Sequence, residues 1–366
     1  MIQRGVIISG GGTGGHLYPA LVVGRRLLAV SPGLGLTFVG TGRDVERKIM
    51  AEQGVAFIPL RIEGLKGRGW RSLRALAILP AAFVRSLAIL LRARPRLVIG
   101  VGGYSSGPIV LLASWLRIPT VILEQNARPG FTNRLLARWV SRAVVAFPST
   151  LPAFRGKGVV LGNPVREEFY ALPAKKRTAV LDVLVFGGSQ GSRFLNDRVA
   201  AALPLLAAAK GRLRLTHQTG TNDLERVRAA YAAAGFDGAE VAAYFPGMAA
   251  YFGRADLVVC RAGATTLAEI IAARKAAVLV PFADASEDHQ TANARELAAV
   301  GGAVVVPEAE ATAEALAGRI LRFLDHPEEL DVMERRLAGL QAEDPAGRIA
   351  GLCLSLMERP AKETPQ

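Results

Sequence analysis

Two glycine-rich segments carry the residue types that bind phosphate. The first spans residues 10–16 and the second spans residues 187–192, and each follows a short apolar run. An apolar run, then glycines, then a helical pattern is typical of a parallel strand that leads into a helix whose N-terminal N–H groups bind phosphate. The repeated pattern therefore predicts two phosphate-binding units in one chain.

His16 ends the first glycine segment and is the candidate general base. A neutral imidazole can take a proton from an attacking hydroxyl near neutral pH. The alternatives are that His16 donates a hydrogen bond to a pyrophosphate, or that it only begins a helix. Glu124 is a second candidate base, although a structural hydrogen bond at a strand end suits it better. We interpret His289 as a polar residue at a helix start, and His217 and His326 as structural.

The first glycine segment also satisfies the dinucleotide-binding fingerprint. The three glycines concerned are Gly10, Gly12 and Gly15. That fingerprint needs an acidic residue at the end of the second strand to hold the ribose, and none precedes Asp44, while Arg43 could suit a 2′-phosphate. One dinucleotide needs one such loop, whereas a third glycine loop occupies residues 100–108. A nicotinamide enzyme is therefore disfavoured. The remaining alternative is that all three segments are only tight strand-to-helix turns.

The glycine segments belong to an alternation of short apolar runs and helical patterns. In the first half we expect strands near residues 6–9, 36–40, 55–59, 97–101, 120–123 and 143–146. In the second half we expect them near residues 183–186, 213–217, 240–243, 257–260, 277–280 and 303–306. Short apolar runs separated by helices indicate doubly wound parallel sheets. The sequence thus predicts an α/β fold with two nucleotide-fold domains, and it places their boundary around residues 161–164.

Length and cysteine content agree with an intracellular protein of two domains. At 366 residues the chain is too long for one ordinary core. Its only cysteines, Cys260 and Cys353, lie in apolar patterns, which predicts reduced thiols and excludes a disulfide framework or a Cys/His metal cluster. The first strand begins close to Met1 without a charged leader and a long apolar stretch, so we expect no signal peptide.

Positive charge is concentrated in residues 61–96. The chain has a formal net charge of +14, and this segment holds nine Lys/Arg residues against one acid, Glu63. It also contains the apolar residues Trp70, Leu73, Leu76, Leu79 and Phe83. Nucleic-acid sites combine basic residues with exposed stacking aromatics, which are few here. Anionic lipid is therefore the expected partner of this basic, apolar surface.

The same segment is not expected to span a membrane. A spanning helix needs ~20 nearly uninterrupted apolar residues, whereas Arg74, Pro80 and Arg85 interrupt the run. The alternative to a lipid-binding surface is a helix that only packs on its sheet.

Seven short motifs occur in order along the chain. They are Gly11-Gly12-Thr13-Gly14-Gly15-His16; Gly102-Gly103-Tyr104 with Ser106-Gly107-Pro108; Glu124-Gln125-Asn126; Gly162-Asn163-Pro164-Val165-Arg166; Gly187-Gly188-Ser189-Gln190-Gly191; Arg261-Ala262-Gly263-Ala264-Thr265-Thr266 with Glu269; and Asp288-His289-Gln290. In this order they resemble the MurG family of bacterial N-acetylglucosaminyltransferases, in glycosyltransferase family 28. The resemblance runs from the first strand to past Gln290.

The resemblance implies a GT-B fold, in which two Rossmann-like doubly wound domains face a cleft. Residues 1–162 would form an N-terminal, membrane-facing acceptor domain, residues 163–344 a UDP-GlcNAc-binding domain, and residues 345–366 a helix that returns to the N-terminal domain. The implied reaction moves N-acetylglucosamine, with inversion, from UDP-GlcNAc to the C4 hydroxyl of the muramoyl sugar of lipid I, giving lipid II. No Asp-X-Asp pair occurs in the sequence, and helix N-termini can stabilise a leaving pyrophosphate, so we expect no metal or other cofactor.

The resemblance also implies individual residue roles, with His16 as the catalytic residue. The implied donor-binding residues are Thr13, Gly14, Gly15, Asn126, Arg166, Ser189, Phe245, Ala264, Thr265, Thr266, Leu267, Ala268, Glu269 and Gln290. The implied acceptor-pyrophosphate residues are Gly11, Gly12, Gly102, Gly103, Tyr104 and Ser106. Glu269 would accept hydrogen bonds from the ribose, and the backbone of Phe245 would read the uracil edge. The alternatives are a solvated helix position for Glu269 and a hinge-side ion pair for Arg166.

The implied partners are UDP-GlcNAc, lipid I, anionic inner-leaflet phospholipid and a cell-wall synthesis complex, with no nucleic acid. The implied location is peripheral, at the cytoplasmic face of the cell membrane. Two other functions stay open: a related GT-B transferase that uses another UDP-sugar or lipid acceptor, and a non-catalytic nucleotide-binding scaffold of the cell wall.

Overall fold

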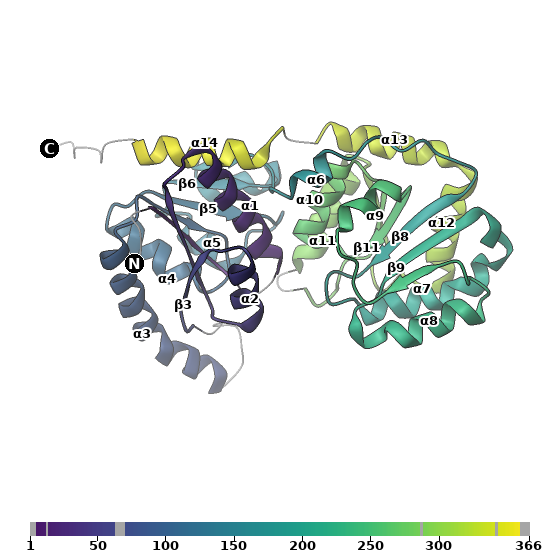
Figure 1. Ribbon diagram of the computed structural model, residues 1–366, viewed down its shortest axis with the longest axis horizontal. Coiled ribbons are helices and arrows are strands. Elements are labelled where there is room, and N and C mark those ends of the chain that lie inside the picture. The colour runs from purple at the N-terminus through teal and green to yellow at the C-terminus, as the bar shows by residue number, and fades with distance from the viewer. Residues whose placement is uncertain (1–4, 12–13, 63–69, 286–287, 341–342, 359–366) are drawn as a thin grey trace. The chain divides into compact units, whose positions relative to one another are not determined.

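The computed structural model describes residues 5–11, 14–62, 70–285, 288–340 and 343–358, with only the backbone at residues 14–16, 45 and 70–77. Contacts within the chain divide it into two units. Unit 1 comprises residues 1–165 and 342–366, and unit 2 comprises residues 166–341. Each unit is built on one parallel sheet, as the alternation of apolar runs predicts (Figure 1).

Unit 1 has a seven-stranded parallel sheet in the order β3-β2-β1-β4-β5-β6-β7. Its strands are β1 (Gly5–Ser9), β2 (Gly35–Gly40), β3 (Ala56–Pro59), β4 (Leu97–Gly100), β5 (Thr120–Glu124), β6 (Arg142–Val145) and β7 (Gly158–Val160). Its helices are α1 (Gly14–Val30), α2 (Asp44–Glu52), α3 (Trp70–Ala93), α4 (Ser106–Trp115), α5 (Phe131–Leu136) and α14 (Pro345–Glu358), and residues Pro148–Phe154 form a 3₁₀ helix. The edge strand β7 is an addition to the predicted set.

Alternate residues of β1 enter opposite cores of unit 1. Val6 and Ile8 pack with helices α1 and α14, whereas Ile7 packs with the residues of α3 and α4 on the other face. Helix α14 packs against α1 (Figure 1), although the whole of unit 2 separates the two helices in the sequence. Because period-two burial fixes the register of a strand, both faces of the sheet are specified by the apolar run itself.

Unit 2 has a six-stranded parallel sheet in the order β10-β9-β8-β11-β12-β13. Its strands are β8 (Leu181–Phe186), β9 (Leu213–Gln218), β10 (Glu240–Ala242), β11 (Leu257–Cys260), β12 (Ala277–Leu279) and β13 (Ala303–Val305). Its α-helices are α6 (Glu167–Tyr170), α7 (Arg193–Leu206), α8 (Leu224–Ala233), α9 (Met248–Arg254), α10 (Ala264–Ala273), α11 (His289–Ala299), α12 (Ala313–Asp325) and α13 (Pro327–Ala338). Residues Ala207–Arg212 and Thr221–Asp223 are 3₁₀ helices.

Both sheets reverse their strand order next to a glycine loop. In unit 1 the reversal falls between β1 and β4, and in unit 2 it falls between β8 and β11. Loops at the carboxyl ends of two such strands diverge, and the crevice between them is the usual ligand site of an open α/β sheet. The predicted phosphate-binding segments therefore lie where this class of fold binds its ligands.

Candidate functional site

The two glycine loops of unit 1 meet at its strand reversal. Gly103 has a φ of +77°, and a Cβ there would lie 2.6 Å from the carbonyl oxygen of Gly11. The Ser9 hydroxyl at the end of β1 donates to the carbonyl of Ser105 over 3.1 Å. Only glycine permits so close an approach of two backbones with this φ. The structure thus brings Gly11 together with the loop that holds Gly102 and Gly103.

Helix α4 begins directly after this loop. The Ser106 hydroxyl donates to the carbonyl of Gly103 over 2.9 Å, which holds the first turn against the glycines, and Tyr104 lies half-buried just before it. The Ser105 hydroxyl is buried, and the described part of the chain offers it no hydrogen-bond partner. First-turn N–H groups lack acceptors within a helix and carry its positive dipole end. The predicted acceptor residues therefore lie at the N-terminus of α4, where an anion is favoured.

The catalytic candidate lies at the start of helix α1. Gly14 and Gly15 are the first two residues of this helix and His16 is the third, while Gly12 and Thr13 lie outside the described residues. The side chain of His16 also lies outside them, so its role stays a prediction.

Glu124, the second candidate base, ends strand β5 as a buried clamp. Its carboxylate accepts from the backbone N–H groups of Asn126 and Gly130, at 3.0 and 2.9 Å, and from the side-chain amides of Asn126 and Asn133, at 3.2 and 2.9 Å. Burial raises the pKa of Glu124, and these donors oppose that effect. With both oxygens engaged, Glu124 orients the loop of Asn126, which is the strand-end role rather than the proton-transfer one.

In unit 2 a buried arginine joins the two loops at the strand reversal. Arg261, directly after β11, donates through Nε to the Ser192 hydroxyl over 3.0 Å. Ser192 caps helix α7 by accepting from the N–H of Leu195 over 3.4 Å. Arg261 also pairs with Glu308 over 2.5 Å and donates to the carbonyl of Val280 over 3.1 Å. The glycine loop that contains the predicted Ser189 is thereby tied to β11, β12 and the segment after β13.

Glu269 lies on helix α10 with a side chain that is 15% exposed. Arg166 approaches it at 3.9 Å and is itself paired with Glu168 at 3.0 Å. Burial raises the pKa of Glu269 to about 7, although the Arg166 guanidinium opposes the shift. A carboxyl that changes charge near neutral pH, in a fold position where ligands bind, is a common property of functional sites. The geometry puts Arg166 and Glu269 together, and it excludes the fully solvated alternative for Glu269.

The other donor-binding candidates on α10 fall into two groups. Ala264, Thr265 and Thr266 form its first turn and are half-buried, whereas Leu267 and Ala268 are buried in the core of unit 2. For Leu267 and Ala268, the backbone is therefore the only part that a ligand could contact.

Two glutamine side chains fix the remaining donor candidates. Oε1 of Gln290 accepts from the N–H groups of Ala262 and Phe282, at 3.1 and 3.0 Å, so only its NH₂ group is left to address a ligand. The N–H of Phe245 donates to Oε1 of Gln218 over 2.8 Å. The N–H of Phe245 is therefore engaged, and its carbonyl, a hydrogen-bond acceptor, is the backbone group left for a ligand.

Sequence reasoning missed Gln218 and gave Arg261 no role of its own. Both are buried, at 1% and 7% exposure, and both follow or end a parallel strand. A long polar side chain at the carboxyl end of a predicted buried strand is the signal that could have found them, because such a side chain must meet backbone groups of the ligand-binding loops.

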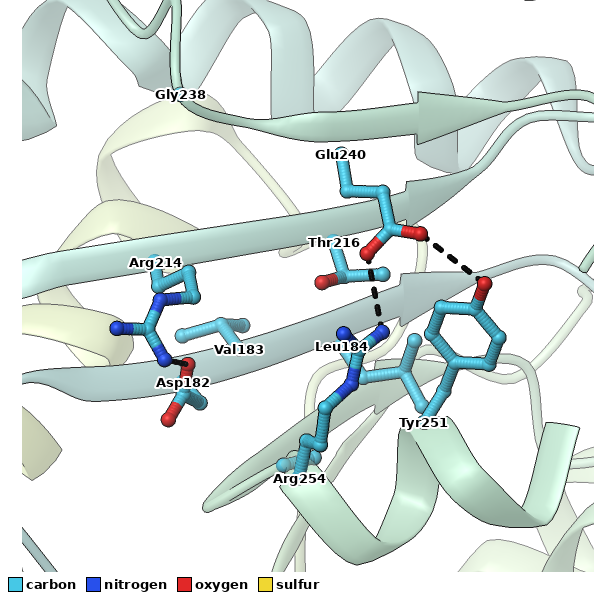
Figure 2. A pocket seen from close by; sticks show the side chains of 10 residues that line it. Asp182, Val183, Leu184, Arg214, Thr216, Gly238, Glu240, Tyr251 and Arg254 are labelled. Atoms are coloured by element: carbon cyan, nitrogen blue, oxygen red, sulfur yellow. Dashed lines mark hydrogen bonds and ion pairs between the residues drawn. The ribbon is translucent and has the colours of Figure 1, made fainter.

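A charged hollow elsewhere in unit 2 is separate from these loops. Figure 2 shows Arg214 pointing toward Asp182, and Tyr251 and Arg254 pointing toward Glu240. Asp182, Arg214 and Glu240 lie within the first two residues of β8, β9 and β10, which is the amino edge of the sheet. Their charges are satisfied by one another, with Arg214–Asp182 and Arg254–Glu240 both at 3.0 Å. The hollow is therefore opposite the edge that carries the glycine loop.

Most of the described part of the basic, apolar segment is helix α3, and the structure tests the expected interface residues only at Leu79 and Phe83. Leu79 and Phe83 are half-buried, because α3 packs on α4, whereas Val84, Leu87 and Leu91 are 70%, 36% and 56% exposed. The side chains of Trp70, Leu73 and Leu76 lie outside the described part of the chain, as do residues 63–69 with Arg68.

Further exposed apolar residues lie at the far end of α4 and beyond α5. Trp115 and Trp139 are 57% and 41% exposed and meet edge to face, with ring centroids 6.1 Å apart, and Arg138 lies over the Trp139 ring at 5.1 Å. Within the described residues, no helix is both long enough and apolar enough to cross a membrane.

Comparison with known proteins matches both units to one family. The glycosyltransferase family 28 N-terminal domain matches residues 6–145, and the glycosyltransferase family 28 C-terminal domain matches residues 182–349. The chain is 44% identical over 356 residues to the UDP-N-acetylglucosamine–N-acetylmuramyl-(pentapeptide) pyrophosphoryl-undecaprenol N-acetylglucosamine transferase of Myxococcus xanthus, covering 96% of this chain and 93% of that protein. The protein of the same name from Syntrophus aciditrophicus is also 44% identical, with 96% and 98% covered.

Two solved structures resemble this chain, one in sequence and fold and the other in fold alone. The crystal structure of Acinetobacter baumannii MurG superposes with a TM-score of 0.81 at 30% identity, covering 96% of this chain and 99% of that one. The glycotransferase of kitacinnamycin superposes with a TM-score of 0.68 at 18% identity, covering 97% and 99%. The second likeness concerns the fold alone.

Proposed function

This chain belongs to glycosyltransferase family 28, and we infer that it transfers N-acetylglucosamine from UDP-GlcNAc to lipid I, which gives lipid II for peptidoglycan synthesis. Its fold is the GT-B fold of two parallel α/β units. The observation that carries the function is that each unit has its own phosphate-type glycine loop at its own strand reversal. A transferase that moves a sugar from a nucleoside diphosphate to an acceptor carried on a lipid pyrophosphate must bind two pyrophosphates, and so needs two such sites.

Unit 2 binds the donor in this proposal. The loop of Ser189 and the N-terminus of α7 receive the diphosphate, since first-turn N–H groups and the helix dipole favour anions. Glu269 accepts from the ribose hydroxyls, and the carbonyl of Phe245 accepts from the uracil. Gln290 donates through its NH₂ group to the sugar, because its oxygen already holds two backbone N–H groups. Arg166 adds a cation beside Glu269.

Unit 1 binds the acceptor in this proposal. The loops of Gly11–Gly12 and Gly102–Tyr104, with Ser106, hold the pyrophosphate of lipid I against the first turn of α4. Thr13, Gly14, Gly15 and Asn126 contribute contacts to the donor from this unit, and Glu124 keeps Asn126 oriented.

The reaction is a single displacement. The C4 hydroxyl of the muramoyl sugar attacks the anomeric carbon of N-acetylglucosamine, the bond from that carbon to the UDP oxygen breaks, and UDP leaves from the opposite face, which inverts the configuration. His16 takes the hydroxyl proton. Helix N-termini stabilise the charge that develops on the leaving pyrophosphate, so the proposal requires no metal or other cofactor.

The membrane part of the proposal places the protein at the cytoplasmic face of the cell membrane, bound peripherally. Basic residues of segment 61–96 attract anionic phospholipid, and the exposed Val84, Leu91, Trp115 and Trp139 enter the interface. A polyprenyl acceptor cannot leave the bilayer, so its enzyme gains from binding the same surface. Its proposed protein partners are other cell-wall synthesis proteins at the same membrane.

The deciding experiment measures UDP release with purified protein. We expect release only when UDP-GlcNAc and lipid I are both present, and we expect a chelator of divalent ions to leave the rate unchanged. Release with another UDP-sugar or another lipid acceptor would identify a related transferase instead. UDP binding without any turnover would identify a scaffold.

A further inference from the structure

Gln218 links two loops of unit 2 that the donor proposal uses for different parts of UDP. It is the last residue of β9 and is 1% exposed. Its Oε1 accepts from the N–H of Phe245 over 2.8 Å, and its Nε2 donates to the carbonyl of Gly188 over 3.0 Å. One buried amide therefore joins the uracil-reading segment to the phosphate loop.

The topology explains why this position can reach both loops. Strand β9 lies between β10, which precedes Phe245, and β8, which precedes Gly188. The carboxyl ends of the three parallel strands lie at one edge, and Gln218 ends the middle one. A neutral amide can donate and accept at once, whereas a carboxylate only accepts and a thioether does little of either.

The backbone after Gln218 strengthens the same link. The N–H groups of Thr219 and Gly220 donate to the carbonyls of Ala242 and Ala243, both over 3.0 Å, which holds the segment before Phe245. On the other side, a Cβ at Gly191 would collide with the carbonyl of Thr219. The phosphate loop thus rests directly on the end of β9, and among the described residues the side chain of Gln218 bonds to both Gly188 and Phe245.

We infer that Gln218 is a positioning residue that fixes the spacing between the uracil-reading backbone of Phe245 and the diphosphate loop at Gly188, so that unit 2 selects a nucleoside diphosphate of the length of UDP. The inference rests on the proposed donor site in unit 2. It assigns Gln218 no contact with UDP, and its effect passes through the two loops.

The test compares inhibition by UDP with inhibition by uridine in the transferase assay. Uridine uses the base-reading segment and the proposed ribose contact of Glu269 but not the diphosphate loop, whereas UDP uses both loops and their spacing. In Gln218→Glu the carboxylate still accepts from Phe245 but cannot donate to Gly188, and its negative charge faces the partial negative charge of that carbonyl oxygen. We expect the inhibition constant of UDP to rise about tenfold or more and that of uridine to change by less than about twofold.

A second variant covers the case in which Gln218→Glu does not fold. Gln218→Met keeps the volume and removes both bonds, so both inhibition constants rise and that of UDP rises more. The donor KM should rise with it, while kcat at saturating donor stays within about threefold of the wild type.

Lys275→Met is the matched control. Lys275 is buried at 3% exposure and donates to the carbonyl of Ala255 over 2.9 Å, just before the amino end of β11. The Lys275→Met variant should have a lower melting temperature than the wild type and unchanged inhibition constants for UDP and uridine. Equal changes for UDP and uridine in the Gln218 variants, or an unchanged UDP constant, would overturn the inference. If wild-type protein is not inhibited by UDP at all, the donor site itself fails before the variants are compared.

Discussion

Units 1 and 2 use the same sheet plan but hold their ligand loops in different ways. In unit 1 the loops after β1 and β4 touch backbone to backbone, at Gly11 and Gly103. In unit 2 the loops after β8 and β11 are joined by side chains, through Arg261 and Ser192. Backbone contact gives a close-fitting phosphate cradle, whereas a side-chain framework also fixes where a base, a ribose and a sugar must lie. The difference fits the proposal that unit 1 binds a lipid pyrophosphate and unit 2 binds a whole nucleotide.

The largest expected effect tests catalysis from unit 1. His16→Ala should lower kcat by roughly 10²–10⁴, the range for loss of a general base, and it should leave the affinity of unit 2 for UDP intact. Steady-state kinetics with both substrates varied measure this. A loss that appears only in the lipid I KM and is recovered at saturating lipid I would make His16 an acceptor-binding residue. An acidic limb of the kcat–pH profile that survives in the variant would also exclude the base.

The next effect separates the membrane surface of unit 1 from the nucleotide site of unit 2. Changing Arg68, Arg71 and Arg74 to Glu should weaken binding to anionic vesicles by about 10²-fold, because each basic residue near such a surface contributes ~1 kcal/mol. Co-sedimentation at low salt measures the loss, with folding checked by circular dichroism. Activity on a short-chain, water-soluble acceptor is the control and should be spared. Equal vesicle binding by both proteins would show that the basic segment is only solvated.

A smaller effect tests the ribose contact in unit 2. Glu269→Ala should raise the donor KM by about 10–100-fold, since a charge-assisted hydrogen bond contributes ~1.5–3 kcal/mol. It should also weaken the preference for UDP over TDP, because the lost partner is a sugar hydroxyl that the two nucleotides do not share. Vesicle binding is the control. An unchanged nucleotide preference would remove Glu269 from the ribose site.

The smallest effect is a pH dependence of donor binding. The pKa of Glu269 is raised to about 7 in the free protein, and the ionised carboxylate is the form that accepts from ribose hydroxyls. UDP affinity should therefore be full above the raised pKa and fall up to about tenfold per pH unit below it. Calorimetric titration with UDP at pH values above and below this pKa measures the affinity. Glu269→Gln is the control, because the UDP phosphate also titrates near pH 6; the same slope in both proteins would contradict the prediction.

Sequence alone predicted the sheets well and the site unevenly. Short apolar runs separated by helical patterns indicated twelve of the strands and their parallel arrangement, and the motifs resembled those of family 28. Glu269 looked partly solvated from its helical pattern, whereas α6 packs on α10 and leaves it 15% exposed. The position of Gln218 at the end of a buried strand could have marked it as a candidate, but its partners, Gly188 and Phe245, lie 30 and 27 residues away. Tertiary packing decides the burial of Glu269 and the partners of Gln218.

Helix α14 also sets the order in which this chain can become folded on the ribosome. Ile349 and Cys353 complete the same core as Val6 and Leu17 of β1 and α1, yet they are translated only after all of unit 2. Domains generally fold as units while synthesis proceeds. The sequence of unit 2 is complete before α14 is translated. Unit 1, whose first strand is translated first, is therefore the last of the two units to be completed. Until α14 emerges, the apolar residues that it covers beside α1 have no partner from that helix.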